Sequence, residues 1–149
     1  VHHSAIDFKI GKAIQVCEGA DLTLISTGGI LPTAVAAAGE LQKQGVAARV
    51  LSMHTVKPLD KEAVLTAARE TGAIATIEEH SILGGLGSAV AGVLAESEGR
   101  KIPFTPIGLE AAFAPTAGDQ TYLREISGLS TGAVVERLLK LVARRRRVR

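Results

Sequence analysis

Short apolar runs alternate along this chain with segments in which apolar residues recur every three or four positions. The first pattern is typical of buried strands, and the second is typical of the helices that cover them. Strands are predicted over residues 13–16, 22–26, 46–53, 73–77 and 104–109. One helix is predicted to have Pro32 in its first turn and to end at Gly45, and a second is predicted to run from the N-cap Asp60 to Gly72. Three more helices are predicted over residues 88–96, over residues 120–126 and after the N-cap Ser130.

The order of these elements predicts the fold class. Strands that alternate with helices form a largely parallel sheet, and the crossovers place helices on both of its faces. The first two strands are joined only by the turn Glu18-Gly19-Ala20-Asp21, so we expect them to form a hairpin with one antiparallel edge strand. The prediction is an α/β fold: a three-layer α/β/α sandwich around a five-stranded mixed sheet.

Composition and charge limit the classes of partner. The 149 residues are 46% hydrophobic and 21% charged, as in one ordinary globular domain, but only 3% are aromatic. So few aromatic residues exclude a stacking surface for carbohydrate or single-stranded nucleic acid. The net charge is +2, and residues 144–149 contain five arginines, so the rest of the chain carries −3. We predict a basic, disordered tail over residues 144–149 and no nucleic-acid partner.

Cysteine content and hydropathy point to a cytoplasmic protein. Cys17 is the only cysteine, so neither an internal disulfide nor a cysteine-rich zinc site can form. No apolar stretch approaches the roughly 18–20 residues of a membrane-spanning helix, and we therefore expect no membrane association.

The densest group of polar residues follows the fourth predicted strand. Glu78-Glu79-His80-Ser81 precedes Gly84-Gly85-Leu86-Gly87 and a helix, and ligands of such sheets bind where the parallel strands end. Two carboxylates and an imidazole could serve as acid and base groups, as an oxygen-rich cation site, or as structural and interface residues. Neighbours on a strand point to opposite faces, so Glu78 and Glu79 need not converge.

Two other strand ends carry weaker candidates. Gly28-Gly29 opens a helix whose free amides could hold a phosphate, or the glycines serve a tight turn. His54 follows the third strand and could bind a ligand or simply be hydrogen-bonded structure. In the loop after it, Asp60 is expected to cap a helix, and Lys57 is free to pair with a carboxylate.

Several of these segments, in this order, resemble the C-terminal domain of transketolases, which is shared with 1-deoxyxylulose-5-phosphate synthase and the beta subunits of 2-oxo-acid dehydrogenases. The resemblance covers about residues 8–142, predicts a domain over 8–143, and is most similar to split transketolases. It rests on Phe8-Lys9-Ile10-Gly11-Lys12-Ala13 with 18–21; Ser26-Thr27-Gly28; Met53-His54-Thr55-Val56-Lys57-Pro58-Leu59-Asp60; Ile77-Glu78-Glu79-His80-Ser81 with 84–90; and Gly128-Leu129-Ser130. Ala111 departs from the family, which usually has an aspartate two residues before the phenylalanine that here is Phe113.

The resemblance implies a function for a larger enzyme. Transketolases of this family move a two-carbon ketol unit between sugar phosphates in pentose phosphate metabolism, using thiamine diphosphate and a divalent metal held by two other domains. This chain has no asparagine, which the metal and diphosphate motif requires, and Gly118-Asp119-Gln120 is not that motif. The implied role is therefore assembly with the remainder of the transketolase, as a homodimer in the complete enzyme, with no cofactor, metal or catalytic residue on this chain, which alone should be inactive.

Alternatives stay open at this point. The chain could be a regulatory module that binds an anion or sugar phosphate at its glycine-rich turns, an oligomerisation domain, or the C-terminal domain of a related thiamine enzyme. The candidate ligand or interface residues are Glu79, His80, Ser81, Gly84, Gly85, Gly87, Gly28, Gly29 and His54.

Overall fold

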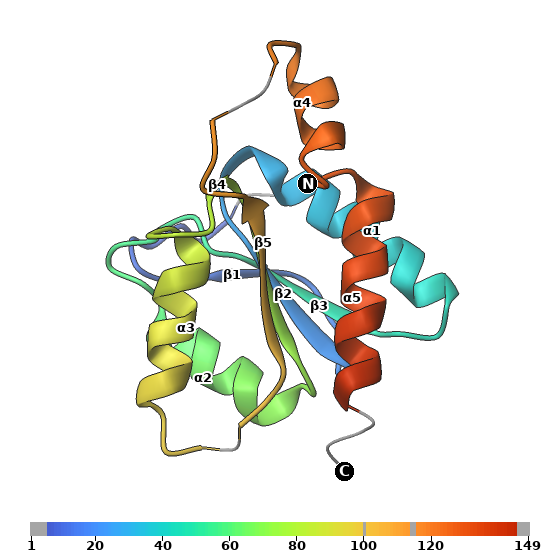
Figure 1. Cartoon of the computed structure of the whole chain (residues 1–149). Helices are drawn as coiled ribbons and strands as arrows, with labels where there is room; N and C mark the ends of the chain where they lie inside the picture. The colour runs from blue at the N-terminus through green and yellow to red at the C-terminus, as the bar shows by residue number, and fades with distance from the viewer. Residues whose placement is uncertain (1–5, 100, 114–115, 146–149) are drawn as a thin grey trace.

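The computed structural model describes residues 6–99, 101–113 and 116–145, and its sheet has the strand order β1-β3-β2-β4-β5 (Figure 1). The strands are β1 (Ile14–Cys17), β2 (Leu22–Ser26), β3 (Ala48–Ser52), β4 (Ile74–Ser81) and β5 (Phe104–Leu109). Strands β2 to β5 are mutually parallel, and β1 is an antiparallel edge strand. The predicted five-stranded mixed sheet is confirmed. We call the edge where β2 to β5 finish the carboxyl end of the sheet and the opposite edge the amino end.

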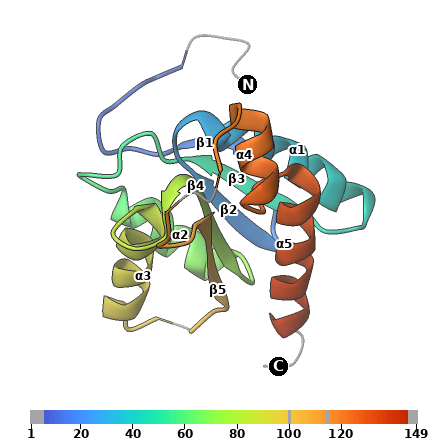
Figure 2. The same cartoon turned by 45° about the horizontal axis from the view of Figure 1, so that its top comes forward.

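Helices cover both faces of this sheet, which confirms the three-layer prediction. They are α1 (Leu31–Lys43), α2 (Lys61–Glu70), α3 (Leu86–Glu96), α4 (Gln120–Ile126) and α5 (Thr131–Arg145), and a 3-10 turn, η1 (Gly28–Ile30), precedes α1. Helices α1 and α5 pack on one face, and α2 and α3 pack on the other (Figures 1 and 2). Helix α4 covers neither face and stands at the carboxyl end. Among the residues described, no helix has the length and apolar character needed to cross a membrane.

The predicted hairpin between the first two strands is wrong. Strand β1 pairs with β3, which lies between β1 and β2. The link from β1 to β2 crosses the start of β3 closely, because the Asp21 amide donates to the Ala47 carbonyl at 2.9 Å. A Cβ on Gly19 would collide with the backbone of Ala48 and Arg49. Glycine at position 19 therefore lets the link pass over β3.

The central strand β2 explains why its apolar run does not alternate with polar residues. All five of its residues are buried, because helices cover both faces of the sheet. Leu22 and Leu24 belong to the core beneath α1 and α5, whereas Ile25 belongs to the core beneath α2 and α3. Period-two geometry thus divides one apolar run between two hydrophobic cores.

Asp60 caps α2 as predicted. Its carboxylate accepts from the Ala63 amide at 3.1 Å, and it also accepts from the Ala13 amide at 2.9 Å.

Two predicted boundaries shift. Strand β4 continues to Ser81, four residues beyond its predicted end, so the Glu-Glu-His-Ser segment belongs to the strand. Helix α5 runs to Arg145, into the predicted basic tail, and residues 146–149 of that tail lie outside the described residues.

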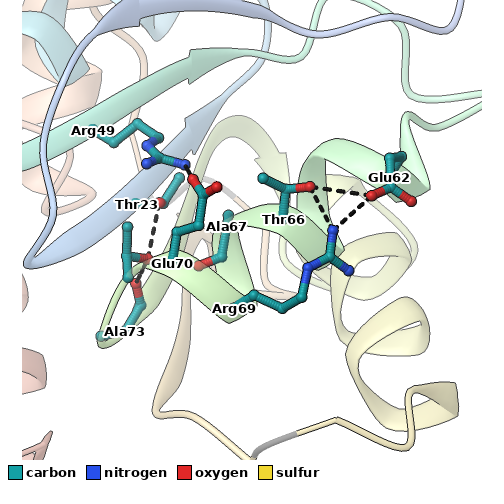
Figure 3. Close-up of polar contacts among 9 residues, drawn as sticks. Thr23, Arg49, Glu62, Thr66, Ala67, Arg69, Glu70 and Ala73 are labelled. Atoms are coloured by element: carbon teal, nitrogen blue, oxygen red, sulfur yellow. Dashed lines mark hydrogen bonds and ion pairs between the residues drawn. The ribbon is translucent and has the colours of Figure 1, made fainter.

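Polar contacts close the amino end of the sheet (Figure 3). The Thr23 and Thr71 hydroxyls lie 3.0 Å apart in the interior, and the Thr71 hydroxyl also donates to the Ala67 carbonyl at 2.9 Å. Nearby, Arg49 on β3 forms an ion pair with Glu70 at the end of α2, with a nitrogen–oxygen distance of 2.7 Å. These contacts tie the end of α2 to strands β2 and β3.

Candidate functional site

The polar residues of β4 lie at the carboxyl end, where the pairing of β4 with β5 becomes irregular between Ile77 and Ser81. Glu78 points toward α3, and Glu79 points toward the opposite face, where it binds Arg124 of α4. The expectation that these two neighbours need not converge is confirmed. Each carboxylate therefore has a separate environment.

Glu78 is buried and caps the first turn of α3. One carboxylate oxygen accepts from the Leu86 amide at 2.7 Å, and the other accepts from the Gly87 amide at 2.8 Å. A negative charge is stabilised there by the partial positive charge of the helix N-terminus. A Cβ on Gly85 would collide with the Glu78 carboxylate, so glycine at that position allows the close approach. The chain's own carboxylate thus occupies the amides that an external anion would need.

Glu79 is the centre of a second polar group. Arg124 donates to both of its carboxylate oxygens, from Nε at 2.8 Å and from Nη2 at 2.6 Å, and Gln120 donates at 3.1 Å. The Arg124 Nη2 also donates to the Gly29 carbonyl at 3.0 Å. The hydrogen bond from Arg124 lowers the pKa of Glu79, and the same bond raises the pKa of Arg124. This group fastens α4 to the ends of β4 and β2.

His80 is exposed, and its ring is held by the adjacent backbone. Its Nδ1 lies 2.9 Å from the Ser81 carbonyl and 3.9 Å from a Glu78 carboxylate oxygen. The Ser81 hydroxyl accepts from the Leu83 amide at 3.2 Å. Because a carbonyl can only accept, the contact with Ser81 requires a proton on Nδ1 and leaves Nε2 as the acceptor of a neutral ring. His80 therefore lies at the surface with its Nδ1 held by the adjacent backbone.

The glycine-rich turn after β4 is organised by its own hydrogen bonds. The Gly84 amide donates to the Ser88 hydroxyl at 2.9 Å, and that hydroxyl donates to the Ile82 carbonyl at 3.0 Å. Gly84 has a φ of +81°, a conformation that other residues rarely adopt. Gly84 therefore has a structural role in this turn.

His54 and the first glycine pair lie apart from His80. His54 follows β3, and β2 separates that strand from β4. Its Nδ1 lies 2.9 Å from the Thr55 hydroxyl, and its ring packs 4.3 Å from the ring of Phe8. Its buried Nε2 has no hydrogen-bond partner among the residues that the structure describes. Gly28 has a φ of +70°, and Gly29 contributes its carbonyl to Arg124. The candidates thus form separate local groups rather than one constellation.

Sequence analysis missed Arg124 and Gln120, which complete the group around Glu79. Gln120 lies 41 positions and Arg124 lies 45 positions along the chain from Glu79. The signal available was their spacing of four on a short predicted helix, which places both on one helix face. Within the described residues, no group of three or more histidine, cysteine, aspartate or glutamate side chains could hold a metal ion.

The chain matches known proteins over most of its length. The family model "Transketolase, C-terminal domain" matches residues 11–141. The 6-deoxy-6-sulfo-D-fructose transketolase subunit of Clostridium sp. (strain MSTE9) is 43% identical over 129 residues, which are 87% of this chain and 39% of that protein. The 1-deoxy-D-xylulose-5-phosphate synthase of Halothermothrix orenii is 36% identical over 136 residues, which are 91% of this chain and 21% of that protein.

A solved structure supports the same relation. A split-gene transketolase, described as an inactive beta4 tetramer, has a TM-score of 0.85 and 39% identity, and the match covers 93% of this chain and 44% of that one. The chain therefore spans less than half the length of each of these relatives.

Proposed function

Because the chain belongs to the family of transketolase C-terminal domains, we propose that it is the assembly domain of a transketolase that transfers a two-carbon ketol unit between sugar phosphates. In this proposal the domain joins the remainder of the enzyme, self-associates as the solved split-gene relative does, and contributes no catalytic residue. The transketolase subunit at 43% identity and the split-gene structure at 39% identity support the transketolase branch.

The observation that carries the assembly role is the internal use of the polar residues on β4. Glu78 holds the N-terminus of α3, and Glu79 holds Arg124 and Gln120 of α4. Both carboxylates shape and brace the carboxyl end of the sheet.

Thiamine diphosphate, which the family implies for the full enzyme, does not fit the described residues. A diphosphate needs free backbone amides or cations, but the Leu86 and Gly87 amides already bind Glu78, and Arg124 already binds Glu79. Its metal ion needs several oxygen ligands, and no such cluster occurs among the residues that the structure describes. The proposal therefore assigns the cofactor and the chemistry to the remainder of the enzyme.

The test is reconstitution from separate polypeptides. The purified chain, the remainder of the enzyme and their mixture are each assayed for ketol transfer between sugar phosphates, and binding is followed by light scattering. We expect binding, and activity only in the mixture. Activity of the chain alone, or no binding to the remainder, would contradict the proposal.

A second candidate is the C-terminal domain of 1-deoxyxylulose-5-phosphate synthase, which the relative at 36% identity over 91% of this chain favours. The same mixture distinguishes the two candidates, because a synthase would form 1-deoxy-D-xylulose 5-phosphate instead of transferring a ketol unit between sugar phosphates. Synthase activity without ketol transfer would select the second candidate.

A further inference from the structure

Positive charge is concentrated in the last part of the chain. Residues 137–149 contain six arginines, one lysine and no aspartate or glutamate. Because the whole chain carries +2 and this stretch carries +7, the rest of the chain carries −5. Attraction of a polyanion would therefore be local to this stretch and not a property of the whole surface.

Helix α5 arranges the first cations of this stretch in a row. Arg137, Lys140 and Arg144 are exposed, and their spacing of three and four positions places them on one face of the helix. The apolar face of α5 is used in the fold, because Leu138 and Leu141 are buried in the core that α5 shares with α1. We call Arg137, Lys140 and Arg144 together the α5 stripe.

Two of the three cations in the α5 stripe have no acidic partner. Lys140 forms an ion pair with Glu136 at 2.6 Å. Arg137 and Arg144 form no ion pair within the described part of the chain. Arg69 on α2 is also exposed, but it pairs with an acidic residue of its own helix (Figure 3). The two arginines of the stripe are therefore available to an external anion.

The α5 stripe lies apart from the polar groups at the end of β4. Helix α5 starts near α4 and runs along the side of the sheet, so its last turn lies at the opposite end of the molecule from α4 (Figure 1). The stripe occupies the second half of that helix. A ligand on the stripe would therefore leave the carboxyl end of the sheet free.

The types of residue in this stretch indicate phosphate as the anion. Six of its seven cations are arginine, whose planar guanidinium binds phosphate through two parallel hydrogen bonds. A row of cations matches a row of anions, and a nucleic-acid backbone supplies one. We expected no nucleic-acid partner because the basic residues were taken as a disordered tail, but α5 orders three of them. The scarcity of aromatic residues excludes stacking on single strands and not contacts with a duplex backbone.

The length of the α5 stripe favours one kind of duplex. With a rise of about 1.5 Å per residue, Arg137 and Arg144 lie about 10 Å apart along the helix axis. The major groove of B-form DNA is about 12 Å wide, so two such side chains can reach the phosphates on both of its sides. The major groove of an RNA duplex is narrow. A membrane surface is disfavoured, because the apolar face of α5 is buried and cannot insert into lipid.

We propose that the α5 stripe, together with the arginines that follow it in the sequence, binds the phosphate backbone of double-stranded DNA without regard to base sequence. Arg137 and Arg144 contact phosphates on the two sides of the major groove. Lys140 lies between them and adds positive charge. This function is separate from the proposed assembly function, and neither depends on the other.

The first experiment measures binding of the 149-residue chain to a fluorescently labelled DNA duplex by anisotropy, at salt concentrations from about 50 to 200 mM. We expect a dissociation constant of about 1–100 μM that rises steeply with salt, because phosphate contacts release counterions. A second duplex of unrelated sequence should bind equally well. Absence of binding at the lowest salt concentration, or a dissociation constant that salt leaves unchanged, would overturn the inference.

Arg137→Gln and Arg144→Gln test the stripe itself. Both side chains are exposed, so circular dichroism should show an unchanged fold. Each variant should weaken binding about threefold or more at low salt and reduce the slope of log K against log salt by about one. Arg69→Gln on α2 makes the same change of charge and is the matched control, which should alter neither quantity. Stripe variants that behave like this control would overturn the inference.

Three further measurements identify what binds and where. A chain without residues 146–149 should still bind DNA, and Arg137→Gln should weaken that binding further; complete loss of binding on truncation would overturn the role of the α5 stripe. An RNA duplex of equal length should bind more weakly than DNA, and equal binding would overturn the choice of DNA. Tighter binding to vesicles that contain phosphatidylserine than to DNA would assign the charge to a membrane and overturn the inference.

The outcome is distinguishable from that of the proposed function. Arg137→Gln should leave reconstituted ketol transfer unchanged, because the stripe lies away from the carboxyl end of the sheet. Loss of DNA binding with full ketol transfer in this variant is the expected result. Loss of both together would overturn the separation of the two functions.

Discussion

At the amino end of the sheet, polar groups satisfy one another across elements, whereas at the carboxyl end polar contacts brace the loops from within and apolar side chains face outward. Asp21 shows the first pattern: its carboxylate accepts from the Ala47 amide at 2.9 Å, and its carbonyl accepts from the Gly72 amide at 3.0 Å. Tyr122 and Phe113 show the second. The amino end therefore completes the fold, whereas the carboxyl end leaves large apolar side chains exposed.

The largest expected effect is the loss of stability that follows from disrupting the amino end. Gly19→Val should destabilise the domain by about 3–5 kcal/mol, because its side chain would meet the backbone of Ala48, which cannot move without displacing β3. The midpoint of thermal unfolding, followed by circular dichroism, should fall by about 10 °C or more. Gly39→Ala is the control: a Cβ there meets open space on α1, so stability should rise slightly. Equal midpoints for wild type and Gly19→Val would contradict the close crossing.

The second-largest effect is expected from removing the cap that Glu78 provides for α3 at the carboxyl end. Glu78→Ala leaves the Leu86 and Gly87 amides without their acceptor, and we expect a loss of about 2–4 kcal/mol in the free energy of unfolding. Urea unfolding measures the total loss, and hydrogen exchange of these two amides should accelerate most. If their exchange is unchanged, the capping role of Glu78 is wrong.

A smaller effect tests the buried hydroxyl pair at the amino end. Thr71→Val keeps the shape of the side chain but removes the hydroxyl that contacts Thr23 and donates to the Ala67 carbonyl. We expect a loss of about 1–2 kcal/mol in urea unfolding. Thr66→Val on the exposed side of α2 is a matched control and should change stability by less than about 0.5 kcal/mol. Equal losses in both variants would remove the distinction between buried and exposed hydroxyls.

The smallest effect is a pH dependence confined to α4. The pKa of Glu79 is lowered from its ordinary value of 4.5, so the stabilisation by Arg124 is complete above the unfolded pKa and is lost as pH falls through the folded pKa. Amide exchange on α4 should therefore show less protection in acid than at neutral pH, while that on α1 stays constant. In Glu79→Gln, the extra protection at neutral pH should be absent. A pH profile of α4 identical in wild type and Glu79→Gln would contradict this anchoring role.

Local sequence patterns predicted most of the fold because burial on two faces leaves a strong signal. The unbroken apolar run of β2 and the Asp60 cap each required only neighbouring residues to interpret. The hairpin prediction failed because a four-residue link looks the same whether the strands pair directly or enclose a third. The collision that a Cβ on Gly19 would make with β3 distinguishes the two cases, and it exists only in three dimensions.

The features of the candidate site also fall into those that local sequence rules predicted and those that only the tertiary structure decided. The sequence alone identified the Glu-Glu-His-Ser segment, its glycine-rich turn and the opposite directions of Glu78 and Glu79, because strand periodicity and turn chemistry are local rules. Only the tertiary structure decided that Glu78 caps α3, that Glu79 binds Arg124 across a separation of 45 residues, and that the exposed apolar side chains gather at one end. Those features depend on where distant segments meet, and chain topology, rather than local propensity, determines such meetings.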